Sequence, residues 1–148
     1  MMNVPRRLLS IAMVLTSGAA LAHHSTASYD MLHEVTIEGT VQDYQWTNPH
    51  SWMKVEAAGA DGVSKLWSLE FGTPSLSIRT GWKPTTFKAG DRARFIFHPR
   101  LDGAPSGILS FAILPDGKTL RGAGASGPPP GAPGAAAGAP PVGASSAP

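Results

Sequence analysis

The feature that most constrains the fold of this chain is the alternation of apolar and polar residues in short segments. It is clearest at 51–57, SWMKVEA, and at 92–98, RARFIFH. A two-residue period places successive side chains on opposite faces of a β-strand. Turn signals such as Asp61-Gly62 and Lys88-Ala89-Gly90-Asp91 lie between such segments. The pattern predicts a mainly β chain with strands at 35–46, 51–57, 65–71, 92–98 and 108–114.

One short helix is expected between the third and fourth of these strands. Thr73-Pro74 has the signature of an N-cap followed by proline at the first helical position, and Ser75–Arg79 should form one or two turns before Gly81. A short final strand is expected near Thr119-Leu120. This order fits a small OB-like five-stranded barrel with one short helix between strands three and four. Closing the sheet removes the exposed edges of a meander.

The first 22 residues have the layout of a signal peptide. Arg6-Arg7 precede an uncharged stretch from Leu8 to Ala22 that ends in small residues. The stretch is short for a membrane span, which needs about 20 apolar residues, although an uncleaved anchor is the alternative. Ala20 and Ala22 supply the small side chains that signal peptidase reads. His23 is therefore expected to begin a periplasmic or secreted protein without a stable membrane anchor.

The charge and the absence of cysteine exclude several classes of function. The chain has 12 Lys and Arg and 10 Asp and Glu, and loss of Arg6 and Arg7 with the leader makes the two counts equal. No basic stripe remains, so no nucleic-acid partner is expected. Because the chain has no cysteine, any metal site has to use histidine and oxygen donors.

The region after the leader divides into a domain and a tail. From Gly122 to Pro148 the chain is rich in glycine, alanine and proline and has no charged or aromatic residue. Such a segment buries too little apolar surface to offset its ordering entropy. We therefore expect a β-barrel domain at 23–121 and a disordered tail at 122–148.

Four fragments resemble a family of small exported bacterial proteins that is classed as a domain of unknown function. They are His23-His24-Ser25 after the leader, the WTNPH-x-W segment from Trp46 to Trp52, the Lys88–Asp91 turn and the closing LPDG turn, Leu114–Gly117. The resemblance extends from His23 to Leu120. It implies export and a small β-rich fold, and it implies no established activity.

Cleavage before His23 predicts a metal site. The new α-amine and the His23 imidazole can chelate one ion, and an imidazole from elsewhere in the chain completes a histidine brace. Nitrogen-rich tetragonal sites suit Cu(II), so copper is the expected ion, and acid should weaken its binding. The other candidates are His50, which ends the stiff Asn48-Pro49-His50 turn, and His98, which precedes Pro99. The candidate metal ligands are thus His23, His24, His50 and His98.

Each of these histidines also has an ordinary structural explanation, as part of a solvated terminus, a capped turn or the surface at a strand end. The alternative function is then a metal-free OB-like module that binds a small ligand or an envelope protein. Aromatic side chains on a barrel face stack well on rings and sugars. The candidate ligand-binding residues are Trp46, Asn48 and Trp52, although several tryptophans in such a domain are also expected in its core.

Signatures of catalysis are missing from the sequence. It has no Gly-x-Ser-x-Gly elbow and no glycine-rich phosphate loop. A copper brace that activates oxygen is a third hypothesis, but the sequence indicates no surface for a substrate. We expect a binding module rather than an enzyme, and we assign no catalytic residue.

Overall fold

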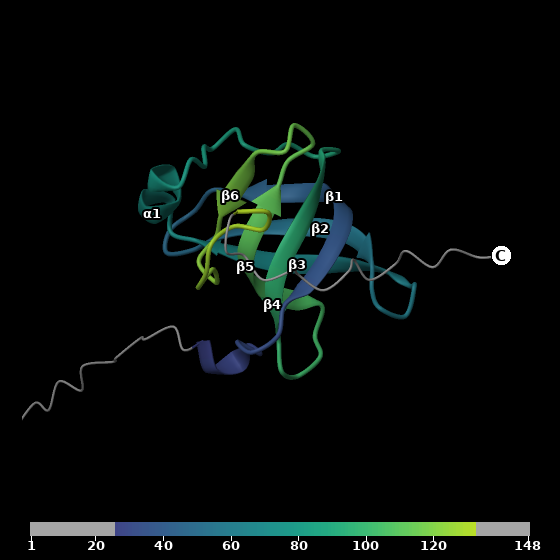
Figure 1. The fold of residues 1–148 in the computed structure, drawn as a ribbon. Coiled ribbons are helices and arrows are strands. Elements are labelled where there is room, and N and C mark those ends of the chain that lie inside the picture. Colours follow the sequence, from purple (N-terminus) through teal and green to yellow (C-terminus); the bar gives the residue numbers. More distant parts are fainter. Residues whose placement is uncertain (1–25, 133–148) are drawn as a thin grey trace, which may run out of the picture.

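The computed structural model describes residues 26–132, which form a small barrel of strands (Figure 1). A short 3-10 helix, η1 (Thr26–Ser28), precedes the strands, and one helix, α1 (Pro74–Arg79), lies between β3 and β4. The strands are β1 Val35–Gln45, β2 Ser51–Ala58, β3 Ser64–Gly72, β4 Arg92–Pro99, β5 Ser106–Ile113 and β6 Thr119–Arg121. The leader predicted at 1–22 and the tail beyond 132 lie outside the described residues.

The pairing of the strands closes the sheet. Hydrogen bonding runs in the order β3-β2-β1-β4-β5-β6, and β3 also pairs with β5. The β3–β5 pairing is parallel and joins Leu69 to Gly107, whereas the other pairs are antiparallel. The first five strands therefore form a closed mixed barrel with one short helix between β3 and β4. The predicted fold class is confirmed.

The local patterns explain where the elements form. In β2, Met53 and Val55 are buried and Lys54 is exposed, as the two-residue period requires. The Thr73 side chain caps α1 by accepting a hydrogen bond from the Leu76 amide at 3.3 Å.

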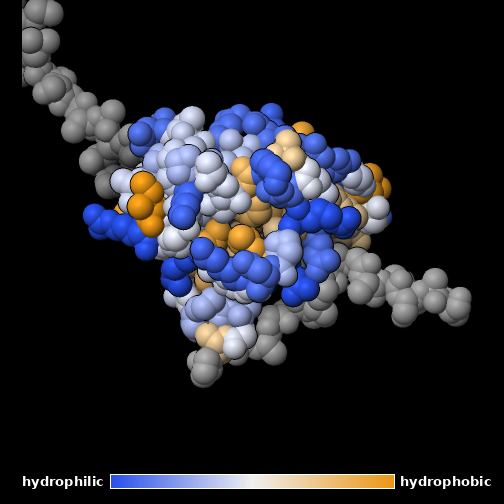
Figure 2. All heavy atoms as spheres, turned by 90° about the horizontal axis from the view of Figure 1, so that it is seen from above, coloured by the Kyte–Doolittle hydropathy of each residue, from blue (hydrophilic) through white to orange (hydrophobic). Residues whose placement is uncertain are grey.

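The surface of the barrel is mostly hydrophilic on the face that Figure 2 shows, which is the molecule of Figure 1 viewed from above. On this face, hydrophilic residues surround a small hydrophobic area. Within residues 26–132, no helix is long and apolar enough to cross a membrane.

A stack of aromatic rings forms part of the core. The ring of Phe71 lies between those of Tyr44, at a centroid distance of 5.3 Å, and Trp82, at 4.5 Å. Trp82 comes from the connector between α1 and β4, yet it is 1% exposed. Its Nε1 donates a hydrogen bond to the Arg121 carbonyl at 2.8 Å. The stack therefore attaches this connector to the barrel.

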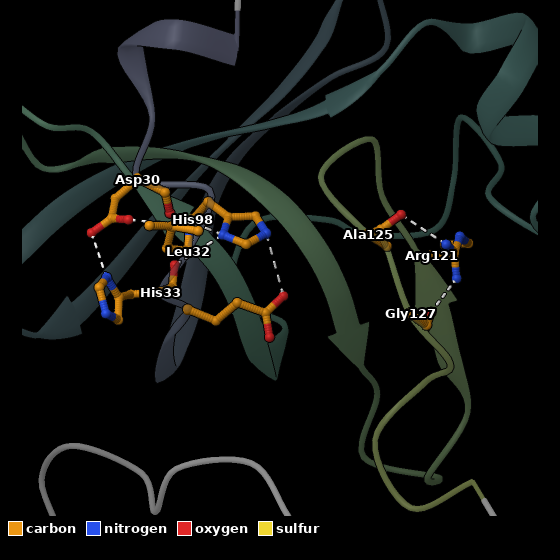
Figure 3. A network of polar contacts seen from close by, with 8 residues as sticks. Asp30, Leu32, His33, His98, Arg121, Ala125 and Gly127 are labelled. Atoms are coloured by element: carbon orange, nitrogen blue, oxygen red, sulfur yellow. Dashed lines mark hydrogen bonds and ion pairs between the residues drawn. The ribbon is translucent and has the colours of Figure 1, made fainter. Parts of the chain in front are cut away.

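The segment after β6 packs against β5. The amide of Gly122 donates to the carbonyl of Ser110, and the amide of Gly124 donates to that of Leu109, both at 2.8 Å. The guanidinium of Arg121 donates to two carbonyls farther along the same segment, as Figure 3 shows. The first residues of the predicted tail are thus hydrogen bonded to the barrel.

The tyrosines, Tyr29 and Tyr44, are expected to ionise at unusually high pH. Burial raises the pKa of Tyr44 to about 12. Burial, followed by the charge of Glu70, raises the pKa of Tyr29. A raised pKa means that folding favours the neutral phenol. The contribution of the neutral phenol to folding stability is complete below the pKa of an unfolded tyrosine, about 10. It is lost as the pH rises toward the pKa of folded Tyr44, about 12.

Phenolate absorbance during an alkaline titration measures this effect. In native buffer both tyrosines should ionise above their values in concentrated urea, and Tyr44→Phe should remove the later of the two transitions. If the folded protein instead ionised both tyrosines together near pH 10, the expected effect of their partial burial on the two pKa values would be disproved.

Candidate functional site

A row of side chains on the face of the sheet away from the core crosses four strands of the barrel, and three of them, Glu70, Ile108 and His98, are covered by other parts of the chain and are only 8%, 7% and 4% exposed. Trp52 on β2 pairs with Glu70 on β3, Glu70 pairs with Ile108 on β5, and Ile108 pairs with His98 on β4. Residues that pair directly across strands point to the same face of a sheet. We call Trp52, Glu70, Ile108 and His98 the outer row. Barrel closure places Glu70 and His98 two strand spacings apart, roughly 10 Å.

His50 lies beside the outer row, in the turn that leads into β2. The Thr47 hydroxyl donates to the carbonyl of His50 at 2.9 Å, and the fully buried Ser51 pairs with Gly72. These contacts hold the turn so that Nδ1 of His50 forms an ion-pair contact with Oε1 of Glu70. The side chains of the pair are 18% and 11% exposed.

Tyr29 contacts the same carboxylate from the segment before β1. Its hydroxyl donates to Oε2 of Glu70 at 3.3 Å. Because its pKa is raised, the phenol stays protonated and remains a donor at neutral pH. The Glu70 carboxylate is thus held between an imidazole and a phenol. We call His50, Glu70 and Tyr29 the His50 cluster.

His98 is enclosed at the end of β4 by the segment that precedes β1 (Figure 3). Its Nδ1 lies 3.1 Å from the carbonyl oxygen of Asp30 and 2.9 Å from that of His33. Carbonyl oxygens only accept hydrogen bonds, so Nδ1 carries the proton. Its Nε2 lies 3.6 Å from Oε1 of Glu34, which is too far for a hydrogen bond.

The short segment before β1 therefore contacts the surroundings of both histidines. Tyr29 belongs to the His50 cluster, and the carbonyl of Asp30 bonds His98. The first described residue is Thr26. The predicted N-terminal ligands, His23 and His24, lie outside the described residues.

The candidate ligand-binding residues are not all brought together. Trp52 lies on the outer face and lines a pocket of about 370 Å³ together with Asp43, Gln45, Met53, Lys54 and Ser68. Trp46 packs on the core instead, with its ring centroid 6.1 Å from that of Phe71. Asn48 is exposed and is joined to Pro49 by a cis peptide bond. Among the three, only Trp52 lines this pocket.

The described part of the barrel supplies no complete set of metal ligands by itself. In residues 26–132, no three His, Cys, Asp or Glu side chains gather where they could hold a metal ion. Nδ1 of His50 and Nδ1 of His98 each face an oxygen, as is common for metal-bound imidazoles. A metal bound at either histidine would need further donors.

Sequence reasoning did not identify Glu70 and Tyr29 as site residues. Alternation in β3 predicts that Glu70 points outward, since Leu69 and Phe71 on either side are buried. No local pattern indicates that His50 and Tyr29 lie against it, because these contacts arise from barrel closure and from strand register.

Comparison with known proteins identifies a family. The profile of a family of unknown function, DUF6152, matches residues 12–110, which include the whole outer row and His50. No curated protein and no solved structure matches the chain. The resemblance to a domain of unknown function is thus confirmed, while the shared motifs and export stay predictions. The chain belongs to this family.

Proposed function

We propose that this member of the DUF6152 family is an exported binding module that holds one copper-like ion through its mature N-terminal residue. The α-amine and imidazole of His23 chelate the ion, and Nε2 of His50 supplies the third nitrogen. His24 is a further donor, although it does not easily reach the ion that His23 chelates. Such a nitrogen set suits Cu(II), which also binds most tightly among the common divalent metals. The leader is removed during export, and its removal creates the amine.

The observation that carries the proposal is the contact between Nδ1 of His50 and the buried carboxylate of Glu70. A carboxylate in this position fixes the ring of a metal-binding imidazole and raises the basicity of its other nitrogen. Tyr29, only six residues after His23, donates to the same carboxylate. The chain that would carry the chelate is thereby tied to the proposed third ligand.

Of the two candidates for the third nitrogen, we favour His50. Its side chain is 18% exposed, and Glu70 connects it to the N-terminal segment through Tyr29. The side chain of His98 is 5% exposed, and its Nε2 faces the carboxylate of Glu34. His50 is therefore the more accessible ligand for an ion that arrives with His23.

Calorimetric titration of the exported protein with Cu(II) tests this proposal. We expect one tight site, and we expect His23→Ala and His50→Ala each to weaken binding at least tenfold, about 1.4 kcal/mol. Acid should weaken binding as well, because protonated imidazole cannot bind the ion. His33→Ala is the matched control, since its side chain is 76% exposed and its ring contacts Asp30. Copper binding by the parent no tighter than that by His23→Ala would end the proposal.

A second candidate function is a metal-free module that binds a small ligand or an envelope protein. The pocket beside Trp52 favours it, because an indole flanked by polar side chains can stack on a ring and hydrogen bond to its edge. In metal-free protein, Trp52→Ala should lose partner capture and His50→Ala should keep it. Equal capture by Trp52→Ala and the parent would exclude this function.

A further inference from the structure

We propose a second cation site, separate from the His23–His50 site, in which Nε2 of His98 and the carboxylate of Glu34 share one divalent ion of the zinc class. Strand pairing brings the two residues together. Val35 at the start of β1 pairs with Phe97 near the end of β4. Glu34 directly precedes β1 and His98 directly follows Phe97 on β4, so their side chains meet at the end of the sheet.

The ring of His98 is fixed with Nε2 directed at the carboxylate. Nδ1 donates to the carbonyls of Asp30 and His33, as Figure 3 shows. With the proton on Nδ1, the neutral ring has its lone pair on Nε2. Backbone carbonyls are common partners for the second nitrogen of a metal-bound imidazole, because they fix its tautomer and its orientation.

The spacing of the two candidate ligand atoms fits an ion between them. Nε2 of His98 and Oε1 of Glu34 are 3.6 Å apart. A charge-assisted hydrogen bond between them would be about 2.7–2.9 Å long. Zinc bonds of about 2.1 Å at a near-tetrahedral angle separate two ligand atoms by about 3.4 Å. The observed 3.6 Å is closer to the spacing of two atoms that bind the same zinc ion than to the length of a hydrogen bond.

Burial and charge at the pair also favour a cation. Nε2 of His98 is buried and has no hydrogen-bond partner among the described residues, a condition that native proteins rarely leave unexplained. The side chain of Glu34 is 42% exposed, so water can reach the ion and complete its coordination. Within residues 26–132, Glu34 makes no ion pair with lysine or arginine, and the nearby Asp30 carboxylate is engaged by His33 at 2.8 Å.

Titration with Zn(II) alone tests the site in a protein that carries His23→Ala and His50→Ala. This background removes the two imidazoles that define the proposed copper site, those of His23 and His50, so each of the two metal proposals can fail without the other. We expect one zinc ion per chain. His98→Asn keeps an amide donor near the Nδ1 position but lacks Nε2, and Glu34→Gln removes the charge at nearly constant size. Each change should weaken zinc binding at least tenfold, while Glu38→Gln, which alters a carboxylate on β1 that pairs with Arg94, should leave it unchanged.

Nitrogen-15 NMR of the His98 ring distinguishes a zinc ion bound at Nε2 from a proton bound there. Zinc should shift the Nε2 resonance, and Glu34→Gln should abolish the shift without unfolding the exposed strand end. The proposal is overturned if this background binds no zinc, or if His98→Asn and Glu34→Gln both bind zinc as tightly as it does. It is also overturned if Nε2 carries a proton that saturating zinc does not displace.

Discussion

Replacement of Phe71 with alanine is expected to lower the free energy of unfolding by about 3–5 kcal/mol. The side chain is 1% exposed and stacks on Tyr44 and on Trp82. Truncation removes both stacks and leaves a cavity that the paired strands around it cannot fill. Because small domains are stable by only about 5–15 kcal/mol, this change removes a large share of the total.

Urea unfolding followed by circular dichroism measures the effect. Phe71→Ala should lower the midpoint and leave the slope unchanged. Leu66→Ala is the matched control on the same strand, where the side chain is 50% exposed, and it should cost less than about 1 kcal/mol. If the alanine variant does not fold, Phe71→Leu should still fold and should cost about 1.5 kcal/mol. A loss below about 1 kcal/mol for Phe71→Ala would contradict the role of the stack.

A side chain at position 107 is expected to strain the barrel where it closes. A Cβ at Gly107 would lie 2.3 Å from Cδ2 of Phe97 and 2.6 Å from the carbonyl oxygen of His98. Gly107 also pairs with Leu69 on β3 and with Pro99 on β4. The carbonyl of His98 belongs to the backbone of β4 and cannot rotate away from an added methyl group as a side chain can. Gly107→Ala should therefore lower the free energy of unfolding by about 3 kcal/mol. It should also move β5 relative to the strands that carry Glu70 and His98.

The matched control for this change is Gly127→Ala, because a Cβ at Gly127 meets no other atom within 4 Å. Thermal unfolding should give a midpoint for Gly107→Ala well below that of the parent, and a midpoint for Gly127→Ala close to it. Equal thermal midpoints for the two variants would contradict the prediction, because they would show that the strands have room for a methyl group where the barrel closes.

The strands and the helix could be predicted because each has a local signal. Met53 and Val55 alternate with charged residues, and Thr73-Pro74 places the start of α1 within one residue of where it lies. Trp82 has no such signal, since its connector has no periodicity. Its burial depends on stacking against Phe71 on β3, a tertiary contact that no periodic pattern in the connector predicts.

The candidate site could be predicted only in part. His50 and His98 stand out in the sequence because each is next to a proline that stiffens its position. Glu70 looks like any outward residue of a strand, and its bond to Tyr29 joins residues 41 positions apart. Only the closed barrel brings these residues together, so the carboxylate that orients His50 could not be inferred from the chain alone.

Native mass spectrometry of the exported protein, loaded with Cu(II) and freed of excess metal, tests the central claim most directly. We predict a chain that begins at His23 and carries one tightly held copper ion, which His23→Ala does not retain. A mature chain that begins at another residue, or one that begins at His23 and retains no copper, would contradict the proposed chelate.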